Sequence, residues 1–145
     1  MDTGTIQNIE NEIIDEFSVF DEWMDKYEYI IEMGKMLPRL DEKYKTEEKK
    51  VAGCQSQVWL NSKYEKGKVV FEADSDAIIT KGLIGLLIKV LSNQTPEEII
   101  KAKLEFIDKI GMKEHLSMNR SNGLTAMIKR MKSDAAKFIL NQRTN

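Results

Sequence analysis

The segment AIITKGLIGLLIKVL, residues 77–91, constrains the fold of this chain more than any other stretch. Apolar side chains would lie on nearly every side of a helix formed by these residues, which is typical of a helix buried all round. The segment also contains Lys81 and Lys89, and it is too short to cross a bilayer comfortably. We therefore expect a helix at the centre of a folded domain rather than a membrane span.

The ends and the glycines of this helix add two further expectations. Ser75 and Asp76 are residue types that cap helix N-termini, so we expect one of them to cap this helix, which should run to about Ser92. Gly82 and Gly85 each cost about 1 kcal/mol of helix propensity. Because glycine has no side chain, we expect both to let another part of the backbone approach closely.

Helical periodicity recurs on both sides of this segment. Apolar residues at intervals of three and four predict helices, and capping residues mark their ends. Two helices are predicted before the strands: residues 5–17, and Trp23 to Gly34 with Asp21 as N-cap and Pro38 after the end. Two short helices are predicted after the central one: the first is opened by a Thr95–Pro96–Glu98 capping box and ends before Lys103, and the second lies near 105–110. A last helix is predicted to start at Ser121 or Asn122. The charged stretch 39–50 is predicted as a solvated loop with room for a helical turn, and 111–123 as an ordered loop.

Alternating apolar residues predict two strands in the middle of the chain. The strands cover residues 56–64 and 68–74, and a hairpin turn at 65–67 joins them. Two strands alone are marginally stable, so we expect a third near residues 49–52. The predicted fold class is α+β: one domain over residues 1–145, with a small antiparallel sheet of about three strands packed against several helices.

Charge and cysteine content narrow the class of protein. The chain of 145 residues has 22 basic and 24 acidic residues, so it lacks the excess of Lys and Arg expected of a nucleic-acid-binding protein. One cysteine cannot form an internal disulfide, which fits a reducing compartment. The acidic N-terminal stretch does not resemble a signal peptide. We therefore expect a cytoplasmic protein without a membrane or nucleic-acid partner.

The lone thiol, Cys54, lies between Gly53 and Gln55, just before the first predicted strand. A closed zinc or iron–sulfur site usually takes four ligands, mostly cysteine and histidine. The chain offers Cys54 and one imidazole, His115, so we expect no metal site. A small cysteine hydrolase would need His115 as a base beside Cys54, and no sequence feature places the two together.

Two other uses of the thiol remain. Free cysteine is among the most buried residue types, so Cys54 could be an inert packing residue in an interaction domain. Its polar and flexible neighbours are more typical of a loop that a partner can reach. The chemistry most natural to such a thiol is exchange, in which its thiolate attacks a sulfur held by another protein.

The residues around Cys54 and three further blocks resemble one known family. GCQSQVW (53–59) is similar to the signature of the SufE family, and three blocks resemble SufE segments in the same order: YIIEMGKMLPRL (29–40), EADSDAIITKGLIGLLI (72–88) and HLSMNRSNGLTAMI (115–128). The resemblance covers nearly the whole chain and implies the SufE/IscU-like α+β fold. IscU-type scaffolds assemble a cluster on several cysteines, and this chain has one.

The resemblance implies a sulfur acceptor for iron–sulfur cluster assembly. In this family a PLP-dependent cysteine desulfurase holds sulfur as a persulfide, and the SufE-like protein accepts that sulfur, stimulates the desulfurase and passes the sulfur on. The implied acceptor is Cys54, and the implied partners are a SufS-like cysteine desulfurase and a SufBCD-like scaffold complex. PLP would belong to the desulfurase, with no cofactor on this chain. A paralogue serving another desulfurase and acceptor pathway would carry the same motif.

The resemblance also implies supporting roles. The residues expected to shape the cysteine loop, three of them by hydrogen bonds, are Gly53, Gln55, Ser56 and Gln57. Asp74 is expected to lie near this loop, whereas a helix cap explains Asp76 on its own.

Two further positions lie before the last predicted helix. Arg120 matches an arginine of the family and serves either as a brace or surface charge, or as a cation that favours the thiolate. His115 matches a histidine of the family, and we expect it to be structural. Met118 stands where the family pattern has proline, which puts the geometry at Arg120 in question without affecting Cys54.

Overall fold

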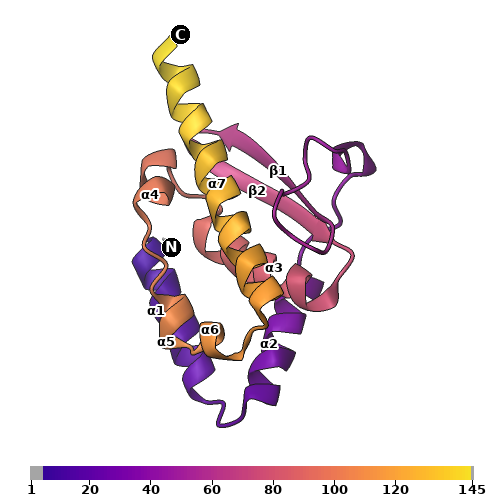
Figure 1. Ribbon diagram of the computed structural model, residues 1–145. Coiled ribbons are helices and arrows are strands. Elements are labelled where there is room, and N and C mark those ends of the chain that lie inside the picture. The colour runs from indigo at the N-terminus through magenta and orange to yellow at the C-terminus, as the bar shows by residue number, and fades with distance from the viewer. Residues whose placement is uncertain (1–4, 145) are drawn as a thin grey trace.

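The central helix is present in the computed structural model, which describes residues 5–144. Helix α3, Ile78–Leu91, is buried along most of its length and packs against α1, α2, β2 and α7. Figure 1 shows α3 behind the long helix α7, Met118–Thr144. The prediction of a central helix ending near Ser92 is confirmed.

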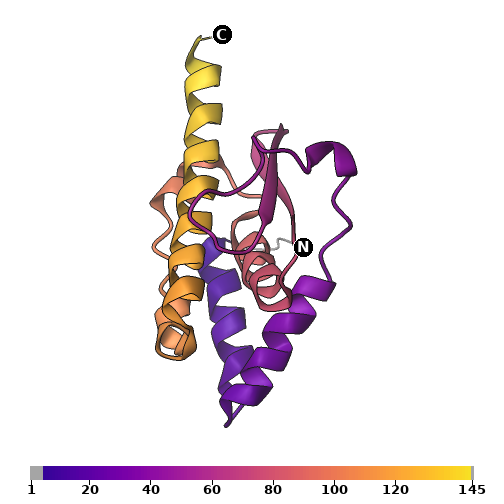
Figure 2. The ribbon, with the colours of Figure 1, turned by 45° about the vertical axis from the view of Figure 1, so that its right-hand side comes forward.

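The first two helices form an open V, which Figure 2 shows below the rest of the molecule. Helix α1, Ile6–Ser18, buries its apolar stripe as predicted, and α2, Trp23–Lys35, ends before Pro38. The prediction of Asp21 as the cap of α2 is wrong. Glu22 holds the N-cap position and makes no side-chain capping bond, because the helix begins one residue later than an Asp21 cap would require.

Helices α2 and α3 touch through their backbones. A Cβ atom added to Gly82 would overlap the carbonyl oxygen of Ile30, and one added to Gly85 would lie 2.8 Å from the oxygen of Met33. Any side chain larger than hydrogen would therefore force the helices apart. The expected close approach at both glycines is confirmed, and its partner is α2.

The sheet is a hairpin of β1, Val58–Glu65, and β2, Lys68–Ser75, paired so that Val58 lies opposite Ser75. Lys66 and Gly67 have φ angles of 53° and 83°, as a two-residue turn of type I′ requires. The predicted third strand is wrong, because residue 50 makes only an isolated bridge to Trp59. Gly53, with φ of 93°, then turns the chain away from the sheet.

The predicted cap of α3 is also wrong. The N-cap residue is Ala77, because the oxygens of Ser75 and Asp76 serve other amides. Ser75 Oγ accepts a hydrogen bond from the backbone nitrogen of Ala77, and Asp76 Oδ1 accepts one from the backbone nitrogen of Gln57. Asp76 therefore joins two parts of the chain instead of capping a helix.

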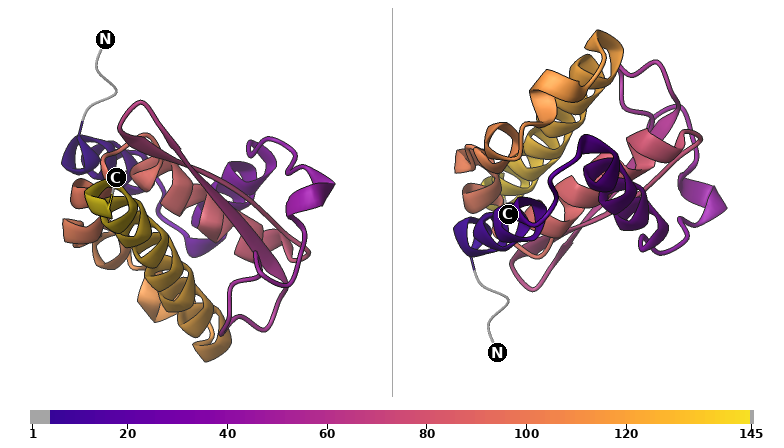
Figure 3. Two further views of the ribbon diagram at one scale, coloured as in Figure 1. Left: turned by 90° about the horizontal axis from the view of Figure 1, so that it is seen from above. Right: turned by 90° about the horizontal axis from the view of Figure 1, so that it is seen from below.

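The second half of the chain is more helical than predicted. It contains α4, Pro96–Lys101, with the expected capping box; α5, Phe106–Lys109, followed by Gly111; α6, Met112–His115; and α7. A single 3₁₀ turn, Glu42–Tyr44, interrupts the charged loop before β1. Figure 3 shows α7 running beside the hairpin, and α3 packs against both β2 and α7.

The prediction of a loop over 111–123 and of a helix start at Ser121 or Asn122 is wrong. Helix α6 occupies part of that stretch, and α7 begins at Met118 because Ser117 supplies the cap, its Oγ accepting a hydrogen bond from the backbone nitrogen of Arg120. Met118 holds the first helical position, where proline is also favoured, so the departure from the family pattern is compatible with this helix start.

The α+β class is confirmed, with the sheet reduced to two strands. Among the described residues, no helix is both long and apolar enough to cross a membrane.

Candidate functional site

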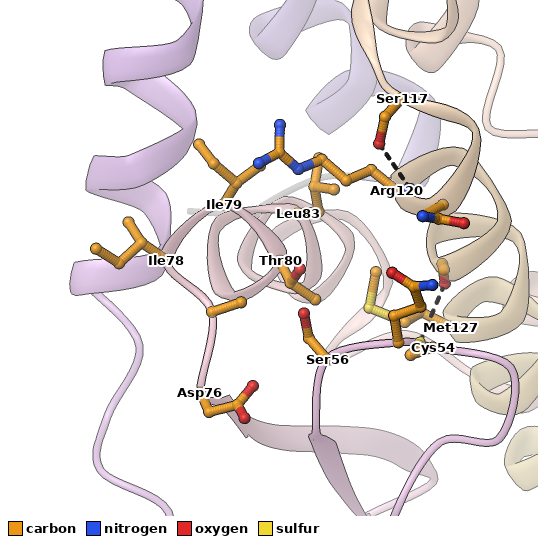
Figure 4. Close-up of a pocket in the computed structure, with 14 residues that line it drawn as sticks. Cys54, Ser56, Asp76, Ile78, Ile79, Thr80, Leu83, Ser117, Arg120 and Met127 are labelled. Atoms are coloured by element: carbon orange, nitrogen blue, oxygen red, sulfur yellow. Dashed lines mark hydrogen bonds between the residues drawn. The ribbon is translucent and has the colours of Figure 1, made fainter.

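Cys54 lines a cavity of about 680 Å³ formed where three parts of the chain meet. The cysteine loop, residues 52–57, forms one side, the start of α3 forms the second, and the first turns of α7 form the third. Figure 4 shows Cys54 and Ser56 on one side of this space and Arg120 on the other. The apolar wall comes from buried side chains of α3 and α7, including Leu83 and Met127.

The thiol of Cys54 is partly sheltered. Its side chain is neither fully buried nor exposed, and Sγ lies 3.6 Å from the carbonyl oxygen of Gly123, to which it donates a weak hydrogen bond. Burial raises the pKa of the Cys54 thiol above its ordinary value. In this conformation burial therefore favours the neutral thiol over the nucleophilic thiolate.

The end of the cysteine loop is fastened by Asp76. Its Oδ1 accepts a hydrogen bond of 3.0 Å from the backbone nitrogen of Gln57, and its own backbone nitrogen donates to the carbonyl oxygen of Gln57 at 3.2 Å. This pair holds the loop to the junction between β2 and α3. Gln55 and Ser56 line the cavity, and their side chains make no hydrogen bond within the part of the chain whose side chains are described, residues 5–141.

The segment that leads into the cysteine loop, residues 48–50, is fastened by Arg130 of α7. Its Nη1 and Nη2 donate to the carbonyl oxygens of Lys50 and Glu48, at 2.9 and 2.8 Å. Its Nε donates to Asp134, which in turn accepts a hydrogen bond from Ser62 of β1. The loop is therefore anchored at both ends. Between these anchors, the hydrogen bond from the Cys54 thiol to the carbonyl oxygen of Gly123 is weak, so we expect it to break more easily than the anchors.

Arg120 projects from the first turn of α7. Its exposed side chain extends past Leu83 toward Ile79 in Figure 4, with the guanidinium turned away from Cys54. Among the side chains of residues 5–141 it has no ion-pair partner. Because the guanidinium points away from the thiol, its charge is not placed to stabilise a Cys54 thiolate in this conformation.

Asp74 lies outside the cavity. Its carboxylate forms ion pairs with Lys45 at 3.1 Å and Lys81 at 3.3 Å. Burial alone would raise the pKa of Asp74, but the hydrogen bonds from Lys45, the Ser75 backbone and Lys81 outweigh burial and lower it. Of the two aspartates in the DSDA block, Asp76 is therefore the one in contact with the cysteine loop.

His115 is also outside the cavity. Its ring stacks on Trp23 with the ring centres 4.1 Å apart, and its carbonyl oxygen accepts a hydrogen bond from Tyr27. The structure therefore does not assemble Cys54 and His115 as a nucleophile and base. Within the described part of the chain, no group of three or more His, Cys, Asp or Glu could hold a metal ion.

Three features of the site escaped sequence reasoning. Gly123 accepts the thiol hydrogen bond through its backbone, Ser117 starts α7, and Arg130 holds two carbonyl oxygens. The role of Ser117 could have been predicted, because serine is a common N-cap residue and accepts a hydrogen bond from the backbone nitrogen three residues later, here that of Arg120. The hydrogen bonds from Arg130 to backbone carbonyl oxygens could not have been predicted, because a backbone acceptor is present at every residue.

A solved structure shares the fold of this chain. The chain matches the solution structure of a hypothetical protein from Thermus thermophilus with a TM-score of 0.76, covering 91% of this chain and 96% of the other at 21% identity. At that identity the likeness concerns the fold alone. Together, the fold and the cavity define a small α+β protein that presents one thiol on a loop anchored at both ends.

Sequence comparison then gives the family. The profile of the SufE family, described as an Fe-S metabolism associated domain, matches residues 11–135, so the chain belongs to the SufE family. It is 45% identical over 130 residues to an uncharacterized SufE-like protein of Rhizobium meliloti, covering 86% of this chain and 93% of that protein. It is 42% identical over 139 residues to the chloroplastic/mitochondrial SufE-like protein 1 of Arabidopsis thaliana, covering 91% of this chain and 38% of that longer protein. The resemblance seen around Cys54 is confirmed as family membership.

Proposed function

We propose that this protein accepts sulfur on Cys54 from the persulfide of a PLP-dependent cysteine desulfurase, stimulates that enzyme and delivers the sulfur for iron–sulfur cluster assembly. The observation that carries the proposal is the place of the thiol. In a chain of the SufE family, the one cysteine lines a cavity on a loop that is fastened at both ends and held between them by the weak contact of Cys54 with Gly123. No other residue of the cavity is a nucleophile of comparable strength.

The transfer is a thiol–persulfide exchange. The Cys54 thiolate attacks the terminal sulfur of the desulfurase persulfide, and a bond forms between Cys54 Sγ and that sulfur. The sulfur–sulfur bond of the donor breaks, and the desulfurase cysteine leaves as a thiolate that takes up a proton. No electron is gained or lost overall. A second exchange of the same kind passes the sulfur to the scaffold, and PLP acts only on the desulfurase.

Docking of the desulfurase activates the thiol by turning the cysteine loop outward. At rest the thiol is partly buried and protonated, which protects it and any bound persulfide from oxidation. Breaking the weak contact with Gly123 exposes it and lowers its pKa toward the ordinary value. A carrier must also release its partner, so we expect a modest and partly polar interface, in the reducing cytoplasm.

Desulfurase turnover tests the proposal. A SufS-like desulfurase is given L-cysteine with and without this protein, and the alanine formed is measured. We expect the wild-type chain to raise the turnover and Cys54→Ser to abolish the increase, while Ser18→Ala, an exposed change at the end of α1, keeps it. Equal stimulation by wild type and Cys54→Ser would overturn the carrier role.

A further inference from the structure

A small groove lies between α7 and the segment formed by residues 103–113, away from the cysteine cavity. It encloses about 190 Å³. Its floor is made of four apolar side chains, Leu104, Ile107, Leu124 and Ile128. Figure 1 shows α5 and α6 beside the lower part of α7, where the groove lies. Drug-sized ligands usually occupy about 300–1,000 Å³, so this groove suits a single large side chain rather than a whole metabolite.

The rim of the groove is basic. Four lysines, Lys103, Lys113, Lys129 and Lys132, surround it with one acidic residue, Asp108. This excess of positive charge stands out on a chain whose net charge is -2. The groove therefore complements an acidic ligand.

Two of the four lysines are already engaged. Lys113 pairs with Asp108 at 3.3 Å, and Lys132 donates to the carbonyl oxygen of Ala102 at 2.6 Å. Lys103 and Lys129 are exposed and make no ion pair or side-chain hydrogen bond with the side chains described, those of residues 5–141. Their charges are therefore available to a partner on either side of the apolar floor.

We infer that this groove docks an acidic segment of a protein partner, which inserts one large apolar side chain while its carboxylates pair with Lys103 and Lys129. A protein segment fits better than a membrane surface, because the apolar side chains lie at the bottom of the groove. None of the exposed large apolar side chains that the structure describes lines it. A bilayer would need apolar side chains that protrude.

The groove is continuous with the cysteine loop across α7. Thr125 and Lys129 line it and also line a second depression, whose other walls include Val51, Ala52 and Gly53 at the start of that loop. The identity of the partner rests on the proposed function: it is a protein that exchanges sulfur with Cys54. A contact to one side of the loop would hold that partner while leaving the loop free to turn outward.

Amide NMR spectra of the isotope-labelled full chain test the groove directly. The probe is a short synthetic peptide with glutamates around one phenylalanine. We expect saturable shifts at Leu104, Ile107 and Ile128, and binding at least about tenfold weaker in the double variant Lys103→Glu/Lys129→Glu. The matched control, Lys109→Glu/Lys137→Glu, reverses two exposed charges outside the groove and should bind the peptide like wild type.

Three results would overturn the inference. The first is the absence of localised shifts at millimolar peptide. The second is an equal response to a peptide with glycine in place of phenylalanine, which would indicate general charge attraction. The third is stronger binding of the groove lysines to anionic lipid vesicles or to a DNA oligonucleotide than to the peptide.

A kinetic measurement connects the groove to sulfur transfer. With a fixed desulfurase, we expect the groove double variant to raise the carrier concentration needed for half-maximal stimulation about tenfold, with little change in the maximal rate. Unchanged half-saturation would remove the link to this partner. If Cys54→Ser also stimulates the desulfurase, the proposed function fails, whereas the peptide measurement still reports on the groove.

Discussion

The state of the Cys54 thiol is set by its surroundings rather than by its own chemistry. Partial burial raises its pKa, and the cation of Arg120 is turned away. We therefore expect iodoacetamide to alkylate Cys54 in the free chain more slowly at neutral pH than it alkylates a peptide of residues 51–57. The midpoint of the rate against pH should lie higher in the protein than in the peptide. A midpoint at or below that of the peptide would show that the thiol is not sheltered.

Asp76 controls how firmly the cysteine loop is held. Asp76→Ala removes the acceptor of the Gln57 amide and frees one end of the loop. We expect alkylation of Cys54 at a fixed pH to become several-fold faster, because the thiol is exposed more often. Asp21→Ala, an exposed aspartate outside the site, is the control. Equal rates for Asp76→Ala and wild type, with both proteins folded by circular dichroism, would contradict this role.

Residue roles can be predicted from the sequence only where the signal is local. Cys54 is marked by its own flanking residues, so it can be identified directly. The contact of Asp76 with Gln57 depends on a β-hairpin that brings together residues distant in sequence, and the DSDA block is equally typical of a helix cap. The orientation of the Arg120 side chain likewise depends on where α7 begins.

At the scale of elements, prediction succeeds where periodicity is strong. Helix α3, the hairpin and the capping box of α4 follow from apolar spacing and turn residues. The third strand fails because a positive φ at Gly53 redirects the chain, and φ cannot be read from a glycine alone. The start of α7 is missed because Ser117 competes with Ser121 and Asn122 as a cap.

Two glycine substitutions should act in opposite directions. Gly82→Ala would drive a Cβ atom into the carbonyl of Ile30, so we expect it to lower the free energy of unfolding by about 3 kcal/mol. Gly123→Ala lies within α7, where the new Cβ would be 3.6 Å from Cys54 Sγ, an ordinary contact. It should stabilise the chain by about 0.5–1 kcal/mol through helix propensity. Urea unfolding measures both, and equal effects would contradict the close packing of α2 and α3.

At the scale of the whole molecule, Asp74 connects the segment before β1, through Lys45, to α3, through Lys81. Its pKa is lowered on folding, so its contribution is complete above the unfolded pKa of about 4 and is lost as pH falls through the lower folded pKa. Asp74→Asn should therefore cost about 1 kcal/mol at neutral pH. Urea unfolding should show that difference shrinking in acid, and a constant difference at every pH would contradict the ion-pair origin.

The cysteine site and the basic groove, where we propose that a partner reacts and is held, lie at different places on the molecule. The cysteine loop, its two anchors and the cavity lie on one side of α7, and the basic groove lies on the other. This layout comes from packing between segments far apart in sequence. The family resemblance locates the thiol, but the local sequence carries no sign of the groove.

The central claim is that Cys54 itself carries the sulfur. The most direct test incubates the protein with a PLP-dependent desulfurase and L-cysteine, without reductant, and maps its peptides by mass spectrometry. We predict that the peptide containing Cys54 gains the mass of one sulfur atom, and that a reductant or a second thiol removes it. An unmodified Cys54 under conditions in which the desulfurase is turning over would contradict the account.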